Sequence, residues 1–257
     1  MNAIVTAGGK TRSNEPLYPI SGGGYKAMLD VNGRPMIQYV LDALNGSAQI
    51  ENIVVVGLPP DNLLESSRPL VLLEDHGDMV ANILAGASKL AALDPAATHC
   101  LVVSSDIPAI TSAMVDWLIE QVGQSDHEIY YNVIERKVME ARYPGSRRTY
   151  VHLKGVQVCG GDMNAIRISL ASSDNSLWDR LIEARKSPLR QAALIGYDTL
   201  FLLLLRRLSV QEAEVAVSRK MGFRGRAILC PYAEMGMDVD KPFQLEIMRE
   251  DLANRHG

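Results

Sequence analysis

Residues suited to binding phosphate lie in a short glycine-containing segment near the start of the chain, A-G-G-K-T-R (Ala7–Arg12). Its two glycines let the backbone approach a ligand closely and direct successive N–H groups at phosphate oxygens. Arg12 could add a charge-assisted hydrogen bond to the same phosphates, and Lys26 in Y-K-A-M-L could contact them from the other side. The segment matches neither the Walker A spacing nor the dinucleotide-binding fingerprint. It predicts a phosphate-binding loop of another kind, with an ordinary turn at Gly8-Gly9 as the alternative.

Carboxylates suited to holding a metal occur in two further segments, S-S-D-I-P (Ser104–Pro108) and M-D-V-D-K-P (Met237–Pro242). Asp106 directly follows an apolar strand-like run. Mg²⁺ is commonly bound by one or two carboxylates together with substrate phosphates. Asp238 and Asp240 are two residues apart, so both would face one side of an extended segment. The sequence therefore predicts a Mg²⁺ site on Asp106 and one residue of the late pair, and it leaves open which one.

The first half of the chain alternates strand and helix patterns that would position these segments. Helical spacing of apolar residues is found at Pro35–Leu44, Asp78–Leu93 and Thr111–Val122, and apolar strand-like runs are found at Ala3–Ala7, Asn52–Leu58, Leu70–Leu73 and Cys100–Ser105. Strands that are apolar throughout indicate a mostly parallel sheet covered on both faces. Ligands then bind beyond the carboxyl ends of the strands, after Thr6, Val56 and Val103. The expected fold is a three-layer α/β/α domain.

The second half of the chain has a different pattern. Glu128–Glu135 is expected to be a strand, and the alternation in Arg148–Cys159 predicts a β-hairpin that turns at Lys154-Gly155. Further elements are expected as helices at Asp174–Lys186, Leu189–Leu208, Val210–Met221 and Pro242–Ala253, and as a strand at Arg226–Tyr232. No linker or repeat interrupts the chain. We expect one domain over residues 1–257, with an NTP-binding half (about 1–125), a hairpin and helical insertion (126–225) and a closing strand and helix (226–257).

Composition restricts the classes of partner. The net charge of −4 over 257 residues gives no general attraction to nucleic acid or to acidic membranes. The isolated Cys100, Cys159 and Cys230 are expected to be buried thiols in a reducing cytosol. The chain begins with a core-type strand rather than a leader, and its apolar run Thr199–Leu205 is far shorter than the ~18 residues that span a bilayer. A cytoplasmic protein is expected, with that run in a core helix or, alternatively, at a homodimer contact or against an apolar tail of the acceptor.

The segments together resemble a known family. A-I-V-T-A-G-G-K-T-R, Y-K-A-M-L-D-V-N-G-R-P, V-S-S-D-I-P and D-V-D-K-P-F-Q-L are similar to nucleotidyltransferases with the glycosyltransferase-A type fold, and most similar to the MobA-like branch that includes molybdenum-cofactor guanylyltransferase. The resemblance covers about the first 120 residues and about the last 20. It implies that the nucleotide is bound by Ala7, Gly8, Gly9, Arg12, Lys26, Asn82, Gly86 and Asp106. It further implies that Lys26 and Arg12 are catalytic and that Asp106 and Asp240 bind Mg²⁺.

Two features depart from the family pattern. Thirteen residues separate Arg12 from Lys26, and this loop is longer than the family pattern leads us to expect. In C-G-G-D-M (Cys159–Met163), Asp162 replaces the asparagine of the family's acceptor-side T-G-G-N motif. The candidates for acceptor binding are Arg147, Arg148, Lys154, Gly160 and Gly161, and solvated surface charge is the alternative for the three basic residues.

The expected reaction is transfer of a nucleoside monophosphate from an NTP, with GTP or CTP favoured, to a small anionic acceptor. An acceptor phosphate would attack the α-phosphorus and pyrophosphate would leave. Molybdopterin is the leading acceptor by family, and sugar phosphates and other small phosphates stay open. A non-catalytic nucleotide-binding regulator and a nucleotide-sugar glycosyltransferase are the alternatives. Asp75 and His76 lie near the expected base pocket, where a structural role is favoured for them.

Overall fold

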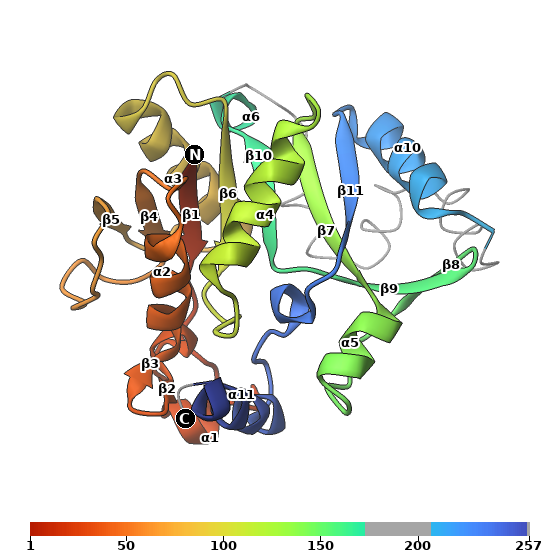
Figure 1. Cartoon of the computed structure of the whole chain (residues 1–257). Helices are drawn as coiled ribbons and strands as arrows, with labels where there is room; N and C mark the ends of the chain where they lie inside the picture. Colours follow the sequence, from red (N-terminus) through yellow and green to blue (C-terminus); the bar gives the residue numbers. More distant parts are fainter. Residues whose placement is uncertain (173–206, 256–257) are drawn as a thin grey trace.

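A nine-stranded sheet forms the centre of the protein, which was analysed as a computed structural model describing residues 1–172 and 207–255 (Figure 1). In order across the sheet, the strands are β5 (Leu70–Leu73), β4 (Ile53–Val56), β1 (Asn2–Thr6), β6 (His99–Ser104), β10 (Met163–Arg167), β7 (Ile129–Glu135), β9 (Val156–Gly160) and β8 (Val151–Leu153). β11 (Gly225–Cys230) pairs with β7 in parallel. All of these strands except β9 and β10 run in one direction. The mostly parallel sheet predicted from the sequence is confirmed.

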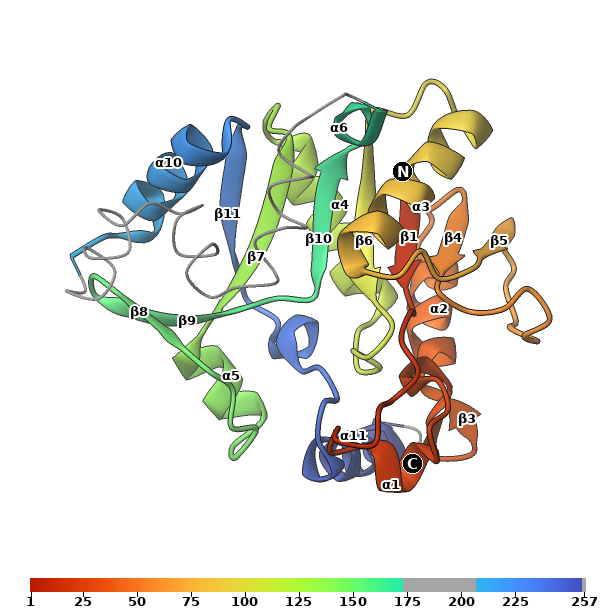
Figure 2. The same cartoon turned by 180° about the vertical axis from the view of Figure 1, so that it is seen from behind.

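Helices cover both faces of the sheet, because the side chains of β1 alternate between two apolar cores. Ala3 and Val5 pack in the core that includes α2 (Met36–Gly46) and α4 (Ser112–Gly123). Ile4 packs on the opposite face, in the core that includes α3 (Met79–Leu93). Figure 1 shows α2 and α4 in front of the sheet, and the reverse view in Figure 2 shows α3 in front. This arrangement confirms the three-layer α/β/α fold.

The start of α3 is fixed by a side-chain cap. The carboxylate of Asp78 accepts hydrogen bonds from the backbone N–H groups of Val80 and Ala81, at 2.8 Å and 3.0 Å. Such a cap satisfies donors that have no partner within the helix. Farther along α3, a Cβ atom added at Gly86 would lie 2.8 Å from a side-chain carbon of Ile4. Glycine at this position therefore lets α3 pack directly on β1.

The second half contains both expected and unexpected elements. The predicted hairpin is present as β8 and β9, with Gly155 at φ +79° in its turn. β10 was not predicted; it lies antiparallel between β6 and β7. The helices here are α5 (Arg136–Arg142), also not predicted, α6 (Ser169–Ser172), α10 (Val210–Met221) and α11 (Pro242–Arg255). The remaining elements are short: α1 (Tyr18–Ser21), η1 (Lys26–Met28), β2 (Asp30–Val31), β3 (Arg34–Pro35) and η2 (Ala233–Gly236).

Two expectations fall outside the described residues: the predicted helix at 174–186 and almost all of the one at 189–208, which includes the Leu200–Leu205 run. The division of the chain into three regions stays a prediction. Among the helices that the structure describes, none combines the length and apolarity needed to cross a membrane. The three cysteines are free and buried, as predicted.

Candidate active site

A pocket of about 480 Å³ lies at the carboxyl end of β1, where the sequence predicts a phosphate-binding loop. Gly8, Gly9 and Arg12 line it from one side, and Lys26 and Asp240 line it from the other. Residues from both ends of the chain meet here because the asparagine of the β2–β3 turn, Asn32, donates a hydrogen bond to a backbone carbonyl of α11. Figures 1 and 2 both show α11 beside the segments that follow β1. The pocket thus combines two of the three predicted segments with Lys26.

The glycine loop is packed too closely for larger residues. A Cβ atom at Gly8 would lie 2.6 Å from the Asn82 amide nitrogen and 3.0 Å from an Asp75 carboxylate oxygen. Gly57 has φ +112°, and a Cβ atom there would lie 2.2 Å from the Gly8 Cα. Gly9 has φ +103°, a conformation that side chains rarely tolerate. The loop backbone is therefore fixed by close contacts, as a loop that presents N–H groups to phosphates must be.

Asn82 and Gly86 have structural contacts of their own. The buried Asn82 side chain accepts a hydrogen bond from the His76 backbone N–H at 2.7 Å and donates one to Asp75 at 2.9 Å. It therefore holds the segment before α3 against the glycine loop. Gly86 contacts Ile4 beneath the sheet. Contact of either residue with a base or ribose stays a prediction, and the structural role expected for Asp75 and His76 agrees with these hydrogen bonds.

Lys26 is held between two carboxylates. Its Nζ atom lies 2.5 Å from Asp106 Oδ2 and 2.6 Å from Asp240 Oδ1. The other oxygen of Asp106 accepts a hydrogen bond from the Ser104 hydroxyl at 2.5 Å. Burial alone would lower the pKa of Lys26, but the negative charges of Asp106 and Asp240 outweigh it, so the pKa is raised above its ordinary 10.5. Lys26 is consequently a permanent ammonium ion at neutral pH.

Backbone hydrogen bonds place the two carboxylates together. The Asp106 carbonyl, after β6, accepts a hydrogen bond from the Val239 N–H at 3.0 Å. The Asp240 N–H donates to the Gln244 side chain of α11 at 3.0 Å. Asp106 is buried, whereas the Asp240 side chain is 57% exposed. The late loop is thus tied to the end of β6 on one side and to α11 on the other, with Asp240 open to the pocket.

Asp238 faces a different cation from Asp240. The Arg148 guanidinium forms a close ion pair with Asp238, and its other terminal nitrogen lies 3.6 Å from Asp162 Oδ2 and donates to the Gly160 carbonyl at 3.3 Å. Asp240 pairs instead with Lys26. The sequence left the choice between Asp238 and Asp240 open, and this pairing favours Asp240 as the residue beside Asp106.

Asp162 is a half-buried carboxyl, with its side chain 31% exposed, that the sequence-based candidates did not include. Burial and the negative charge of Asp106 raise its pKa to about 7, although Arg148 acts in the opposite direction. Within the described residues its Oδ2 atom accepts no hydrogen bond and has only the ion pair with Arg148. The available signal was the aspartate in C-G-G-D-M. Its contacts could not be read from the sequence because they depend on the insertion of β10 beside β6.

The glycines of this motif serve close packing. A Cβ atom at Gly160 would lie 2.2 Å from the Tyr131 hydroxyl, and one at Gly161 would lie 3.0 Å from Asn132 Cβ. The chain can therefore pass tightly over β7 before it enters β10. Direct contact of these glycines with an acceptor stays a prediction.

The two other basic candidates, Arg147 and Lys154, have contacts different from those of Arg148. The Arg147 guanidinium stacks over the Phe243 ring at 5.1 Å from its centroid. Lys154 lies at the hairpin turn, and its backbone N–H donates to the Leu208 carbonyl. Both views show this turn at the opposite side of the sheet from β1 (Figures 1 and 2). The structure does not bring Lys154 to the pocket.

Two lysines were missed as pocket residues. Lys10 and Lys241 line the pocket beside Arg12 and Asp240, and the Lys10 ammonium lies 5.3 Å from the centre of the Tyr25 ring. Each directly adjoins a residue that was identified, so the sequence did carry a signal. These lysines add positive charge at the open side of the pocket.

The carboxylates suit Mg²⁺ in kind and placement. Asp106 and Asp240 supply hard oxygen donors that converge on one cation, the Lys26 ammonium. No group of three or more His, Cys, Asp or Glu side chains forms a complete metal site in the part of the chain that the structure describes. Two carboxylates completed by substrate phosphates are a common environment for Mg²⁺. The residues present therefore fit the ion that the resemblance implies.

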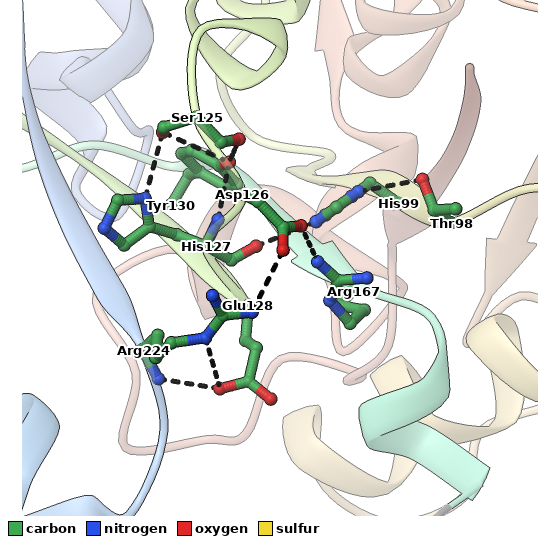
Figure 3. A network of polar contacts seen from close by, with 9 residues as sticks. All are labelled: Thr98, His99, Ser125, Asp126, His127, Glu128, Tyr130, Arg167 and Arg224. Atoms are coloured by element: carbon green, nitrogen blue, oxygen red, sulfur yellow. Dashed lines mark hydrogen bonds and ion pairs between the residues drawn. The ribbon is translucent and has the colours of Figure 1, made fainter.

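A second charged network lies at the other edge of the sheet, where β7 and β11 begin (Figure 3). Asp126 forms ion pairs with Arg167 and Arg224, and Glu128 forms an ion pair with Arg224. Two histidine rings pack edge-on against Tyr130 in the same network. Its two carboxylates are matched by two arginines.

Comparison with known proteins gives concordant matches. The family model of the MobA-like NTP transferase domain matches residues 3–219. A "Probable molybdenum cofactor guanylyltransferase" from Thermococcus sibiricus is 26% identical over 129 residues, which are 49% of this chain and 58% of that protein. The chain thus spans somewhat more than half the length of this curated relative.

Solved structures with a similar fold include a transferase and a synthetase. A hypothetical transferase from Thermus thermophilus is 33% identical, with a TM-score of 0.80 over 95% of this chain and 98% of that one. A CMP:2-keto-3-deoxy-manno-octonic acid synthetase complexed with CTP has a TM-score of 0.60 at 16% identity, over 99% of both chains. The second likeness is one of fold.

Proposed function

Because the chain belongs to the MobA-like NTP transferase domain family, we propose that it transfers a nucleoside monophosphate from an NTP to a small phosphorylated acceptor and releases pyrophosphate. The observation that carries the proposal is the convergence of Lys26, Asp106 and Asp240 beside the glycine loop. One cation and two carboxylates at the ligand-binding edge of a mostly parallel sheet could together bind a metal ion and neutralise phosphate charge during transfer.

The triphosphate binds along the glycine loop in this proposal. The backbone N–H groups of Gly8 and Gly9 are directed at phosphate oxygens, and Arg12 adds a charge-assisted hydrogen bond. Lys10 and Lys241 raise the positive charge at the mouth of the pocket. GTP and CTP are the favoured nucleotides, because the named relatives are a guanylyltransferase and a synthetase complexed with CTP.

Asp106 and Asp240 would hold Mg²⁺. When bound, the ion would neutralise phosphate charge and fix the phosphate geometry. Lys26 occupies the position between these carboxylates in the free protein. If these carboxylates held Mg²⁺, the Lys26 ammonium group would be free to pair with phosphate oxygens. Added negative charge develops on those oxygens in the transition state.

The chemistry requires no side-chain nucleophile. An oxygen of the acceptor phosphate forms a bond to the α-phosphorus, and the bond from that phosphorus to the bridging oxygen of pyrophosphate breaks. The acceptor phosphate is already ionised at neutral pH, so no general base is needed. Positioning the two phosphates and offsetting their repulsion are the main tasks, and Lys26 and Arg12 perform the second.

The acceptor is proposed to be related to the molybdenum cofactor, in line with the curated relative. Sugar phosphates and other small phosphates are the alternative acceptors. The test is pyrophosphate release with each NTP and Mg²⁺ across a panel of these acceptors. We expect release with GTP or CTP and one acceptor class. Tight NTP binding without release on any acceptor would contradict transfer and support a regulatory nucleotide-binding role.

A further inference from the structure

Gln244, the third residue of α11, is a buried glutamine whose side-chain amide is hydrogen-bonded at both ends. It is 4% exposed; its Oε1 atom accepts from the Asp240 N–H at 3.0 Å, and its Nε2 atom donates to the Ser146 carbonyl at 3.4 Å. A glutamine at this position of a helix often accepts a hydrogen bond from a backbone N–H before the helix, which stabilises the helix start. The bond to Ser146 goes beyond that role, because it joins α11 to a segment 98 residues earlier in the chain.

The segment that contains Ser146 is a turn between α5 and β8, residues 143–148. Ser146 is fully buried, and Arg147 has φ +54°, a left-handed conformation that costs free energy in a residue with a side chain. Such strain persists only where the surrounding contacts hold it. Three consecutive residues make these contacts with the late segment 238–244: Ser146 bonds to Gln244, Arg147 stacks over Phe243, and Arg148 pairs with Asp238. The 143–148 turn is therefore a fixed support for the start of α11.

Asp240 needs this support once its carboxylate no longer pairs with Lys26. The Asp240 side chain is 57% exposed and lines the pocket, where the Lys26 ammonium lies 2.6 Å away. Mg²⁺ bound to Asp240 would replace that ammonium, so the contact with Lys26 cannot be what orients the carboxylate toward the ion. The hydrogen bond from the Asp240 backbone to Gln244 does not involve the carboxylate and would remain. Groups that hold a metal ligand in place commonly change metal affinity by about 10- to 100-fold when they are removed.

We propose that Gln244 is a positioning residue for the metal site, whose buried amide holds Asp240 in place for Mg²⁺ by tying its backbone to the 143–148 turn. The inference rests on the proposed nucleotidyl transfer and deepens it by adding a residue that prepares the site. Because Gln244 is buried, it acts through Asp240 rather than by contact with a ligand. Two features thus have one explanation: the hydrogen bond to Ser146, which helix capping does not require, and the strained backbone of Arg147.

The same chemical change at two buried glutamines tests the proposal. Gln244→Met keeps the length of the side chain and removes both of its hydrogen bonds. Gln38→Met is the matched control, because Gln38 in α2 is also 4% exposed and its amide bonds to the Glu65 carbonyl and N–H, at 2.8 Å and 3.0 Å, outside the pocket lining. Electron paramagnetic resonance measures Mn²⁺ binding in the presence of a non-hydrolysable GTP or CTP analogue. We expect Gln244→Met to weaken Mn²⁺ binding by about tenfold and Gln38→Met to leave it within about threefold of the wild type, although both variants lower the urea midpoint.

Equal Mn²⁺ binding in the two variants would overturn the proposal. Hydrogen exchange at the Asp240 amide of the wild-type protein is decisive even if Gln244→Met fails to fold: slow exchange supports the bond to Gln244, and exchange at the rate of an unprotected amide would overturn it. A wild-type protein that binds no Mn²⁺ with the analogue would refute the metal site and, with it, the role of Gln244. Wild-type Mn²⁺ binding that Gln244→Met leaves unchanged refutes the positioning role alone, while pyrophosphate release, assayed separately, tests transfer itself.

Discussion

The two edges of the central sheet carry charged clusters that are built differently. At the amino edge, Asp126 and Glu128 are matched by Arg167 and Arg224, and the Asp126 side chain is 71% exposed (Figure 3). At the carboxyl edge, four carboxylates share Lys26 and Arg148, and most of these side chains are largely buried. Exposed, balanced ion pairs contribute little to stability and need no further partner. A partly buried cluster with excess negative charge costs free energy unless something offsets it, and this cost supports the proposed cation site at Asp106 and Asp240.

The largest expected effect is a loss of activity when a carboxylate at the carboxyl edge is removed, with no such loss at the amino edge. Asp106→Ala removes the buried carboxylate next to Lys26, and we expect Mg²⁺-dependent pyrophosphate release to fall by about 1,000-fold or more, because charge stabilisation in the reacting site is lost. Circular dichroism should show an intact fold. Asp126→Ala, at the amino edge, should retain wild-type turnover. Full activity in Asp106→Ala would refute the assignment of this carboxylate to the metal.

Lys26→Ala should have the next largest effect. If the ammonium group acts mainly on charge that develops during transfer, kcat should fall by about 100-fold while the Kd for NTP rises less than tenfold. Single-turnover kinetics and equilibrium NTP binding give the two quantities. Equal losses in both would show that Lys26 only binds the nucleotide.

Gly86→Ala probes whether the glycine serves packing or the nucleotide. The added Cβ atom would lie 2.8 Å from Ile4, so we expect a loss of about 1–3 kcal/mol in the free energy of unfolding, with NTP affinity nearly unchanged. Gly123→Ala is the matched control, since a Cβ atom there meets nothing within 4 Å. Urea unfolding measures both variants. A stable Gly86→Ala protein with weak NTP binding would instead support the predicted nucleotide contact.

The smallest effect is expected at the amino edge. The hydrogen bond from Arg224, opposed by desolvation and aided by Arg167, holds the pKa of Asp126 below its ordinary 3.8. A lowered pKa stabilises the folded state above pH 3.8, and this contribution is lost as the pH falls through the lowered value. Since Asp126 is exposed, Asp126→Asn should not measurably shift the urea midpoint at pH 7. An NMR titration checks the pKa, and a clear shift of the midpoint would show that this network is structurally important.

The sequence predicted the fold well for strands that are buried on both faces of the sheet. The central residues of β1, β4 and β6 are apolar because alternate residues, such as Ile4 and Val5, pack in separate cores. β10 was missed because the short M-N-A-I-R run follows the glycines without a strong strand signal, and its place between β6 and β7 is a matter of topology. α5 was missed because its seven residues include four charged ones.

The candidate site was likewise predictable only where a local sequence pattern marks the residues. The glycine loop and Asp106 could be identified because each follows a recognisable strand, and Lys26 could be identified because it lies in a segment that resembles the family. The pairing of Arg148 with Asp162 and Asp238 joins three distant segments, so no local spacing encodes it. Lys154 was included because it adjoins a hairpin turn in the sequence, but that turn lies across the sheet from the pocket.

The central claim is that Asp106, Lys26 and Asp240 form the metal-dependent nucleotide site. The most direct test is electron paramagnetic resonance of Mn²⁺ binding in the presence of a non-hydrolysable GTP or CTP analogue, with Asp240→Asn compared with Asp238→Asn. We predict that Asp240→Asn weakens Mn²⁺ binding by about tenfold or more, whereas Asp238→Asn leaves it within about threefold of the wild type. Unchanged Mn²⁺ binding in Asp240→Asn, or loss only in Asp238→Asn, would contradict the account.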